Sequence, residues 1–147
     1  MSLECNIERV DTSVALELAQ LEQLCFSKPW KVEQLIPDLE RESAYYLIAK
    51  NNSAPVGYAG IYISFDEADI SRICVSPEYR RCGFAKQLMN AIINYCKQNS
   101  ILLLHLDVKA NNQPAIELYK SFGFCEDCVR KRYYSDGTDA VLMTKKI

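Results

Sequence analysis

The chain has 147 residues, of which 49% are hydrophobic, and this suits one compact domain over residues 1–147 with a real core. Its formal net charge of −2 lacks the basic surplus that is typical of nucleic-acid-binding proteins. No apolar run approaches the roughly 20 residues that span a bilayer, and residues 1–5 lack the basic flank and apolar core of a signal peptide. We therefore expect a cytoplasmic protein that binds neither nucleic acid nor membrane.

The predicted elements begin with a strand over residues 3–10, followed by a helix that Thr12 or Ser13 can cap. The apolar face of this helix is expected to carry Val14, Leu18, Leu21, Leu24 and Cys25. Residues 27–30 break the helix. The pattern over 32–39 predicts a second helix, in which the proline should cause a kink or an early stop.

Three strands are predicted next, over 44–50, 55–64 and 68–75, with a hairpin turn at 51–54 between the first two. The helix that follows covers 83–98. Its apolar stripe consists of Phe84, Leu88, Ile92 and Tyr95.

Residues 101–108 are nearly all apolar, which is typical of a central strand covered on both faces. A short helix beginning at Asn112 or Gln113 follows, and strands over 125–131 and 139–145 finish the chain. Helices packed on a mixed sheet indicate an α+β fold.

The chain has seven cysteines, an odd number, and they are scattered along the sequence. A cytosolic protein of this size needs no disulfides. Cys125 and Cys128 form a single C-x-x-C pair in a strand-like segment, where positions three apart point to opposite faces. A zinc ribbon would need a second such pair. We therefore expect no metal site.

A basic loop, Arg80-Arg81-Cys82-Gly83-Phe84-Ala85, leads from a predicted strand into a helix. The free N–H groups of a first helical turn and the helix dipole make an anion site there. Gly83 lets the backbone approach a phosphate closely, and Ala85 is small enough not to block it. The spacing fits neither a Walker A motif nor a dinucleotide fingerprint. It predicts a site for the pyrophosphate of a larger cofactor.

The pattern Arg80-x-x-Gly83-x-Ala85 resembles the acetyl-coenzyme A loop of the GNAT superfamily of N-acetyltransferases, Gln/Arg-x-x-Gly-x-Gly/Ala. The resemblance continues through residues 106–112, 115–119, 123–124, 130–134 and 139–143. With Pro29-Trp30, this order and spacing look like the bacterial ribosomal-protein alanine N-acetyltransferases (the RimI group) over nearly the whole chain. The resemblance implies the GNAT fold, a mixed and mostly antiparallel sheet splayed around acetyl-CoA and flanked by about four helices.

The resemblance implies that Tyr119 protonates the leaving thiolate, which suits a phenol with a pKa of about 10. Asp107 stands where this group carries a glutamate base, and its shorter side chain favours contact through a water. From the residues alone, Tyr119 could be a core aromatic and Asp107 the polar end of a buried strand. Glu67 and Asp69 are rival bases, and His105, on the strand face of Asp107, could relay a proton or simply pack.

The resemblance also assigns the cofactor site. In the family, a bulge in the strand equivalent to Ile73-Cys74-Val75 frees backbone N–H groups toward the thioester, although an ordinary buried strand fits these residues equally well. Asn112 matches the asparagine that bonds the pantetheine arm, and it can also cap a helix. The residues expected at acetyl-CoA are Ile73, Cys74, Val75, Arg80, Arg81, Cys82, Gly83, Phe84, Ala85, Lys86 and Asn112.

The basic segment 130–132 is followed by Tyr133 and Tyr134. In the alanine acetyltransferases the matching stretch lies where the acceptor peptide enters, so Tyr133 or Tyr134 should line that slot and Trp30 should form its opposite wall. Without the resemblance, the segment could be a solvated strand or loop or a weak RNA contact, and Trp30 a buried staple.

Three functions remain open. The leading one is direct, ternary-complex transfer of acetyl from acetyl-CoA to the α-amino group of a ribosomal protein with an N-terminal alanine. The others are acetylation of a small amine or a lysine side chain, and acetyl-CoA binding without catalysis. Cys74 and Cys82, near the expected cofactor, keep a ping-pong route open. We expect a monomer or a weak dimer.

Overall fold

The computed structural model describes residues 5–147, which form a seven-stranded sheet in the order β1-β2-β3-β4-β5-β7-β6. Its strands are β1 (Asn6–Arg9), β2 (Ala44–Asn51), β3 (Ala54–Ser64), β4 (Glu67–Val75), β5 (Leu103–Lys109), β6 (Cys125–Arg130) and β7 (Ala140–Lys146). Every neighbouring pair is antiparallel except β4 and β5, which are parallel. The sheet is therefore mixed and mostly antiparallel, as predicted.

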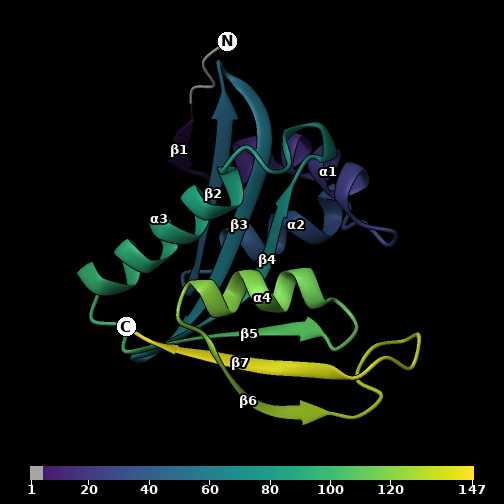
Figure 1. Cartoon of the computed structure of the whole chain (residues 1–147). Helices are drawn as coiled ribbons and strands as arrows, with labels where there is room; N and C mark the ends of the chain where they lie inside the picture. The colour runs from purple at the N-terminus through teal and green to yellow at the C-terminus, as the bar shows by residue number, and fades with distance from the viewer. Residues whose placement is uncertain (1–4) are drawn as a thin grey trace.

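Four α-helices flank this sheet: α1 (Ala15–Cys25), α2 (Val32–Glu40), α3 (Phe84–Gln98) and α4 (Gln113–Ser121). Helices α1 and α2 cover one face, and α3 and α4 lie on the other (Figure 1). Among the described residues, no helix is both long and apolar enough to cross a membrane. The α+β architecture that the sequence predicts is confirmed.

The first helix begins differently from its prediction. Asp11, and not Thr12 or Ser13, provides the cap, because its carboxylate accepts the backbone N–H of Ser13 at 2.9 Å. A 3-10 turn, η1 (Thr12–Val14), then leads into α1. Leu24 is 57% exposed, so it does not belong to the apolar face. Residues 3 and 4 of the predicted first strand lie outside the described residues.

Of the two predicted effects of the proline, a kink or an early stop, the early stop does not occur, because α2 continues through Pro37 to Glu40. Side-chain contacts on both sides of the proline hold this turn in place. Leu35 is fully buried, and the Asp38 carboxylate accepts the hydroxyl of Tyr62 at 2.5 Å. Packing therefore outweighs the hydrogen bond that a proline removes.

The predicted apolar stripe of α3 is confirmed. Phe84, Leu88 and Ile92 are at most 2% exposed and belong to the larger core, where α3 lies against β2, β3 and β4. Tyr95 completes the stripe and stacks on Tyr45 of β2, with ring centroids 3.6 Å apart. Because this packing fixes the helix, it also fixes the loop that precedes it.

Strand β5 is covered on one face only, which contradicts the prediction that both faces are covered. Leu104, Leu106 and Val108 are buried beneath α4 and its surroundings, whereas Asp107 is exposed. Leu102 precedes the strand and is 56% exposed. Helices α1 and α2 pack over β2, β3 and β4 and leave the second face of β5 open (Figure 1).

Strands β4 and β5 separate soon after they pair. Their register joins Glu67, Ala68 and Asp69 to residues 103–105 and ends there, while β4 continues to Val75. Figure 1 shows the two strands diverging. Beyond Asp69, β4 is paired only with β3, and the sheet opens at this point.

A bulge in β4 lies at Ser71, because Arg72 pairs with Gly60 and Ile70 pairs with Ile61. The bulge expected at Ile73–Val75 is therefore wrong: those residues pair regularly with β3. The Ser71 hydroxyl donates to the Gly60 carbonyl at 3.1 Å, which stabilises the extra residue. The extra residue of a bulge shifts by one position the alternation of side chains between the two faces of the sheet. The Arg72 side chain therefore points to the face that α1 covers.

We predict that Gly60→Ala destabilises the protein by about 2 kcal/mol, because overpacking in a core has costs of this order. The added Cβ would overlap the Tyr46 ring. Urea denaturation of the variant measures the loss. The cost should be much smaller in a Tyr46→Leu background, and an equal cost in both backgrounds would contradict this explanation.

Candidate active site

A hollow of about 640 Å³ lies where β4 and β5 separate. It is lined by β4, β5, α4 and two loops, through Cys25, Phe26, Ser27, Lys28, Ile70, Ser71, Arg72, Ile73, Leu106, Asp107, Val108, Lys109, Asn112, Ala115, Tyr119, Tyr134, Ser135 and Asp136. Five of the predicted site residues therefore meet in one hollow: Ile73, Asp107, Asn112, Tyr119 and Tyr134.

The predicted anion loop has the backbone shape that close approach of a phosphate requires. Gly83 caps α3 with φ of 88°, and a Cβ at this position would meet nothing within 4 Å. Within residues 5–147, the N–H groups of residues 84–86 have no side-chain cap. Arg81, Cys82 and Lys86 are exposed around them. The loop therefore leaves backbone N–H groups and basic side chains open to an anion.

Arg80 connects this loop to the end of β4. Its Nε donates to the carbonyl oxygen of Val75 at 3.1 Å. Val75 and Cys74 are buried, and their backbone forms the part of β4 that has no β5 partner. The anion loop is therefore tied to the end of β4 that has no β5 partner.

Tyr119 lies on α4, half-buried, with its ring edge-to-face against Phe124 at 6.0 Å. Burial raises the pKa of its hydroxyl above the ordinary value of 10. At neutral pH this phenol is therefore protonated and can give a proton to a group in the hollow. Asn112 caps α4 by accepting the N–H of Ala115 at 3.3 Å, and it lines the hollow as well.

Of the three candidate carboxylates, only Asp107 lines the hollow. Asp69 faces a smaller cavity of about 210 Å³, which also borders Asp107. Burial, together with the charges of Asp107 and Glu67, raises the pKa of Asp69. Position therefore favours Asp107 as the base.

Glu67 is bound to His105, whose Nε2 lies 2.6 Å from the carboxylate. The other ring nitrogen of His105 lies 2.8 Å from the Thr144 hydroxyl, which in turn donates to Asp127. This chain of polar groups crosses β4, β5, β7 and β6 beside the hollow. These hydrogen bonds hold His105 in place and engage the Glu67 carboxylate.

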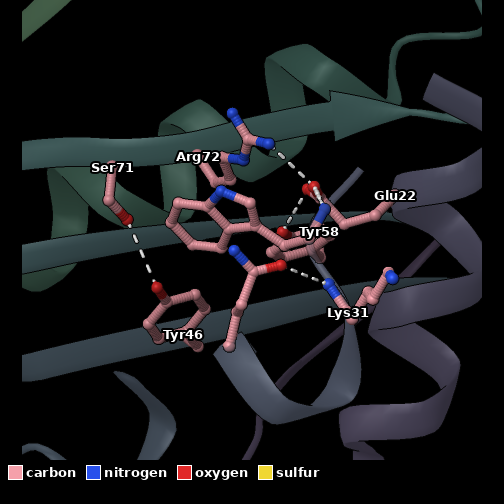
Figure 2. Close-up of polar contacts among 8 residues, drawn as sticks. Glu22, Lys31, Tyr46, Tyr58, Ser71 and Arg72 are labelled. Atoms are coloured by element: carbon pink, nitrogen blue, oxygen red, sulfur yellow. Dashed lines mark hydrogen bonds and ion pairs between the residues drawn. The ribbon is translucent and has the colours of Figure 1, made fainter. Parts of the chain in front are cut away.

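A buried ion pair forms the wall of the hollow on the α1 side, and sequence reasoning missed it (Figure 2). Glu22 is fully buried and accepts the Tyr58 hydroxyl at 2.6 Å, the Trp30 backbone N–H at 2.8 Å and Arg72 Nη2 at 2.8 Å. The guanidinium of Arg72 lies 4.1 Å from the Phe26 ring centroid and 4.4 Å from that of Trp30.

This arrangement places Trp30 behind Arg72, and Phe26 and Lys28 line the hollow in its place. A sequence signal was present, because Glu22 interrupts the apolar face of α1 between Leu21 and Cys25. An acid at such a position needs a buried partner.

The loop between β6 and β7 contributes Tyr134, whereas Tyr133 is 46% exposed and does not line the hollow. Burial and the charge of Asp107 raise the pKa of Tyr134 to about 12. Lys28 Nζ lies 3.2 Å from the Ser135 hydroxyl, so this loop contacts the loop after α1. The two loops flank one end of the hollow.

Among residues 5–147, no cluster of His, Cys, Asp or Glu side chains is arranged to hold a metal ion. Cys125 and Cys128 are exposed on β6, as Cys82 is on the anion loop. Cys25 lines the hollow, and a hydrogen bond with Cys74 lowers the pKa of Cys25 to about 7.

Comparison with known proteins agrees with this geometry. Residues 15–124 match the acetyltransferase (GNAT) family. A relative in Bacillus subtilis (strain 168), named as a putative ribosomal protein bS18-alanine N-acetyltransferase, is 36% identical over 84% of this chain and 83% of its own length. The ribosomal protein bS18-alanine N-acetyltransferase of Escherichia coli (strain K12) is 30% identical over 100% and 99%.

Solved structures give the same result. The crystal structure of the ribosomal-protein-S18-alanine N-acetyltransferase from Escherichia coli has a TM-score of 0.92, with 28% identity, covering 98% of this chain and 94% of that one. An N-acetyltransferase from Thermoplasma acidophilum in complex with coenzyme A shares the fold, with a TM-score of 0.83 at 18% identity and coverage of 98% and 99%. The chain belongs to the GNAT family of acetyltransferases, and it is an N-acetyltransferase.

Proposed function

We propose that this enzyme acetylates the α-amino group of a ribosomal protein that begins with alanine, using acetyl-CoA in a direct, ternary-complex reaction in the cytoplasm. One observation carries the proposal: a phenol, Tyr119, and a carboxylate, Asp107, line a single hollow together with the loops after α1 and between β6 and β7. The named activities of the relatives in Bacillus subtilis and Escherichia coli support the choice of acceptor.

The chain offers three sets of contacts for acetyl-CoA, which supplies the acetyl group as a reactive thioester when bound. The N–H groups of residues 84–86 and the side chains of Arg81 and Lys86 would hold the pyrophosphate. Asn112 would bond the pantetheine arm. The backbone of Ile73–Val75, free on the β5 side, would bond the thioester carbonyl.

Two side chains, Asp107 on β5 and Tyr119 on α4, would transfer the protons. Asp107 would accept the proton of the α-amine through a bridging water, and Tyr119 would give its proton to the departing sulfur. An α-amine has a pKa of about 7.7–8.0, so a weak base suffices. Tyr134 would line the slot of the acceptor.

Of the two cysteines expected near the cofactor, Cys74 and Cys82, neither suits a ping-pong route, whereas Cys25, which lines the hollow with a pKa of about 7, could carry an acyl group. The hydrogen bond that the Cys74 thiol donates to Cys25, together with burial, raises the pKa of Cys74, so this residue stays a thiol and is a poor nucleophile. Cys82 is exposed on the anion loop and does not line the hollow. An acyl-cysteine on either residue is therefore disfavoured.

Intact-mass spectrometry of candidate acceptors, incubated with the protein and acetyl-CoA, tests the proposal. The panel holds peptides with free Ala, Ser, Gly or Met termini, blocked peptides that carry lysine, and small amines. We expect one acetyl group on free small-residue termini, with alanine preferred. Transfer only to lysine or small amines would contradict the proposed acceptor, and no transfer despite acetyl-CoA binding would favour a non-catalytic module.

Tyr119→Phe should lower kcat by about a hundredfold or more, because general acids contribute factors of this size. The Kd for acetyl-CoA should change little, since the ring remains. With its raised pKa, Tyr119 is protonated below pH 10, so wild-type kcat should not fall between pH 7 and 9.5. Tyr95→Phe, on α3 and outside the hollow, is the matched control. Equal losses in both variants would refute the acid role.

Asp107→Asn should lower kcat/KM at pH 7 by about tenfold or more, because the amine then loses its proton acceptor. The defect should shrink at pH 9, where an α-amine is already mostly neutral. Asp107→Glu, which provides the carboxylate that the resemblance implies, should keep activity. A defect of Asp107→Asn that does not vary with pH would contradict this role.

A further inference from the structure

Arg72 is held rigidly in the wall of the hollow. Its guanidinium lies over the rings of Phe26 and Trp30, at 4.1 and 4.4 Å from their centroids. It is also paired with Glu22 (Figure 2). The Glu22 carboxylate is itself fixed by Tyr58 and by the backbone of Trp30. An arginine oriented in this way loses little freedom when it binds a ligand.

Part of this guanidinium still has unused hydrogen-bonding capacity. Arginine has five N–H donors, and Nη2 is the nitrogen that pairs with Glu22. Among residues 5–147, Arg72 Nε is buried and has no hydrogen-bond partner. The side chain is 20% exposed and lines the hollow. Because the buried Nε is closed to a bound molecule, the donors that can reach an acceptor oxygen in the hollow are those on the exposed part of the side chain.

Arg72 and Asp107 line the hollow from β4 and β5, the strands that separate around it. The hollow therefore has a positively charged hydrogen-bond donor, the Arg72 guanidinium, on one wall and the Asp107 carboxylate on the other. In an amino-terminal residue, the α-carbon bears the amine, and the carbonyl oxygen of the same residue lies two bonds from that α-carbon. A lysine side chain carries an amine with no carbonyl near it.

We propose that Arg72 binds the carbonyl oxygen of the acceptor's first residue, and that this contact selects an α-amino group over a lysine side chain. The inference rests on the proposed function, because it assigns a specificity role to a wall of the same site. In this arrangement Asp107 receives the amine while Arg72 sets its position.

The test is a double-mutant cycle between residue 72 and the acceptor. One acceptor is a peptide with N-terminal alanine, and the other is its analogue with a trans-alkene in place of the first peptide bond. Arg72→Lys keeps a charge for Glu22 but loses the planar fork. It should raise KM for the peptide by about tenfold to a hundredfold, the range for a hydrogen bond to a charged group, with little change in kcat. KM for the alkene analogue should barely change.

The matched control is Arg41→Lys. Arg41 also stacks on an aromatic ring, Tyr62 at 4.4 Å, and pairs with Asp38, but it lies outside the hollow. Glu22→Gln combined with Arg72→Gln is the second variant, because it leaves no buried charge unpaired. It should show the same selective loss of the peptide.

An equal rise in KM for both acceptors would overturn the inference while leaving the proposed function intact. It would then be clear that Arg72 serves only to shape the wall. If the wild-type protein acetylates no free amino terminus, the proposed function itself fails, and the role of Arg72 fails with it.

Discussion

The separation of β4 and β5 is the constraint on which the rest of this structure depends. Three residue pairs join the strands, and beyond Asp69 each follows a different part of the fold. Helices α1 and α2 pack on the β4 side, whereas β5 joins β7 and β6. A closed sheet would satisfy the β4 backbone with β5 hydrogen bonds and leave no hollow. The open edge provides both backbone donors and space for two substrates.

Much of the fold follows from local pattern. The stripe beginning at Phe84 identifies α3, and the hairpin turn at Asn52 and Ser53, both with positive φ, lies where the sequence predicts it. Contacts distant in sequence decide the exceptions. The apolar run that ends at Val108 indicates two buried faces, yet one face of β5 is open because no helix packs on it. The bulge at Ser71 depends on its contact with Gly60 across the hairpin.

The candidate site likewise contains features that local sequence predicts and features that depend on contacts distant in sequence. The position of Gly83 was predictable because a loop before a helix is a local feature, whereas the resemblance, and not helical spacing, assigned Tyr119 to the site. The pair formed by Glu22 and Arg72 was not, since the two residues are 50 positions apart in the chain. Burying a carboxylate is costly unless several donors surround it, so this pair also fixes where Trp30 can lie. The wall of the hollow is therefore set by electrostatics that no short motif reveals.

The most direct test of this account is a crystal structure with a bisubstrate, in which coenzyme A is joined through its sulfur and an acetyl group to a peptide with N-terminal alanine. The account predicts that the pyrophosphate lies on the N–H groups of residues 84–86. It also predicts that the sulfur lies within hydrogen-bond distance of the Tyr119 hydroxyl, with the peptide nitrogen bound to Asp107 directly or through one water. A peptide bound outside the hollow, or a sulfur remote from Tyr119, would contradict it.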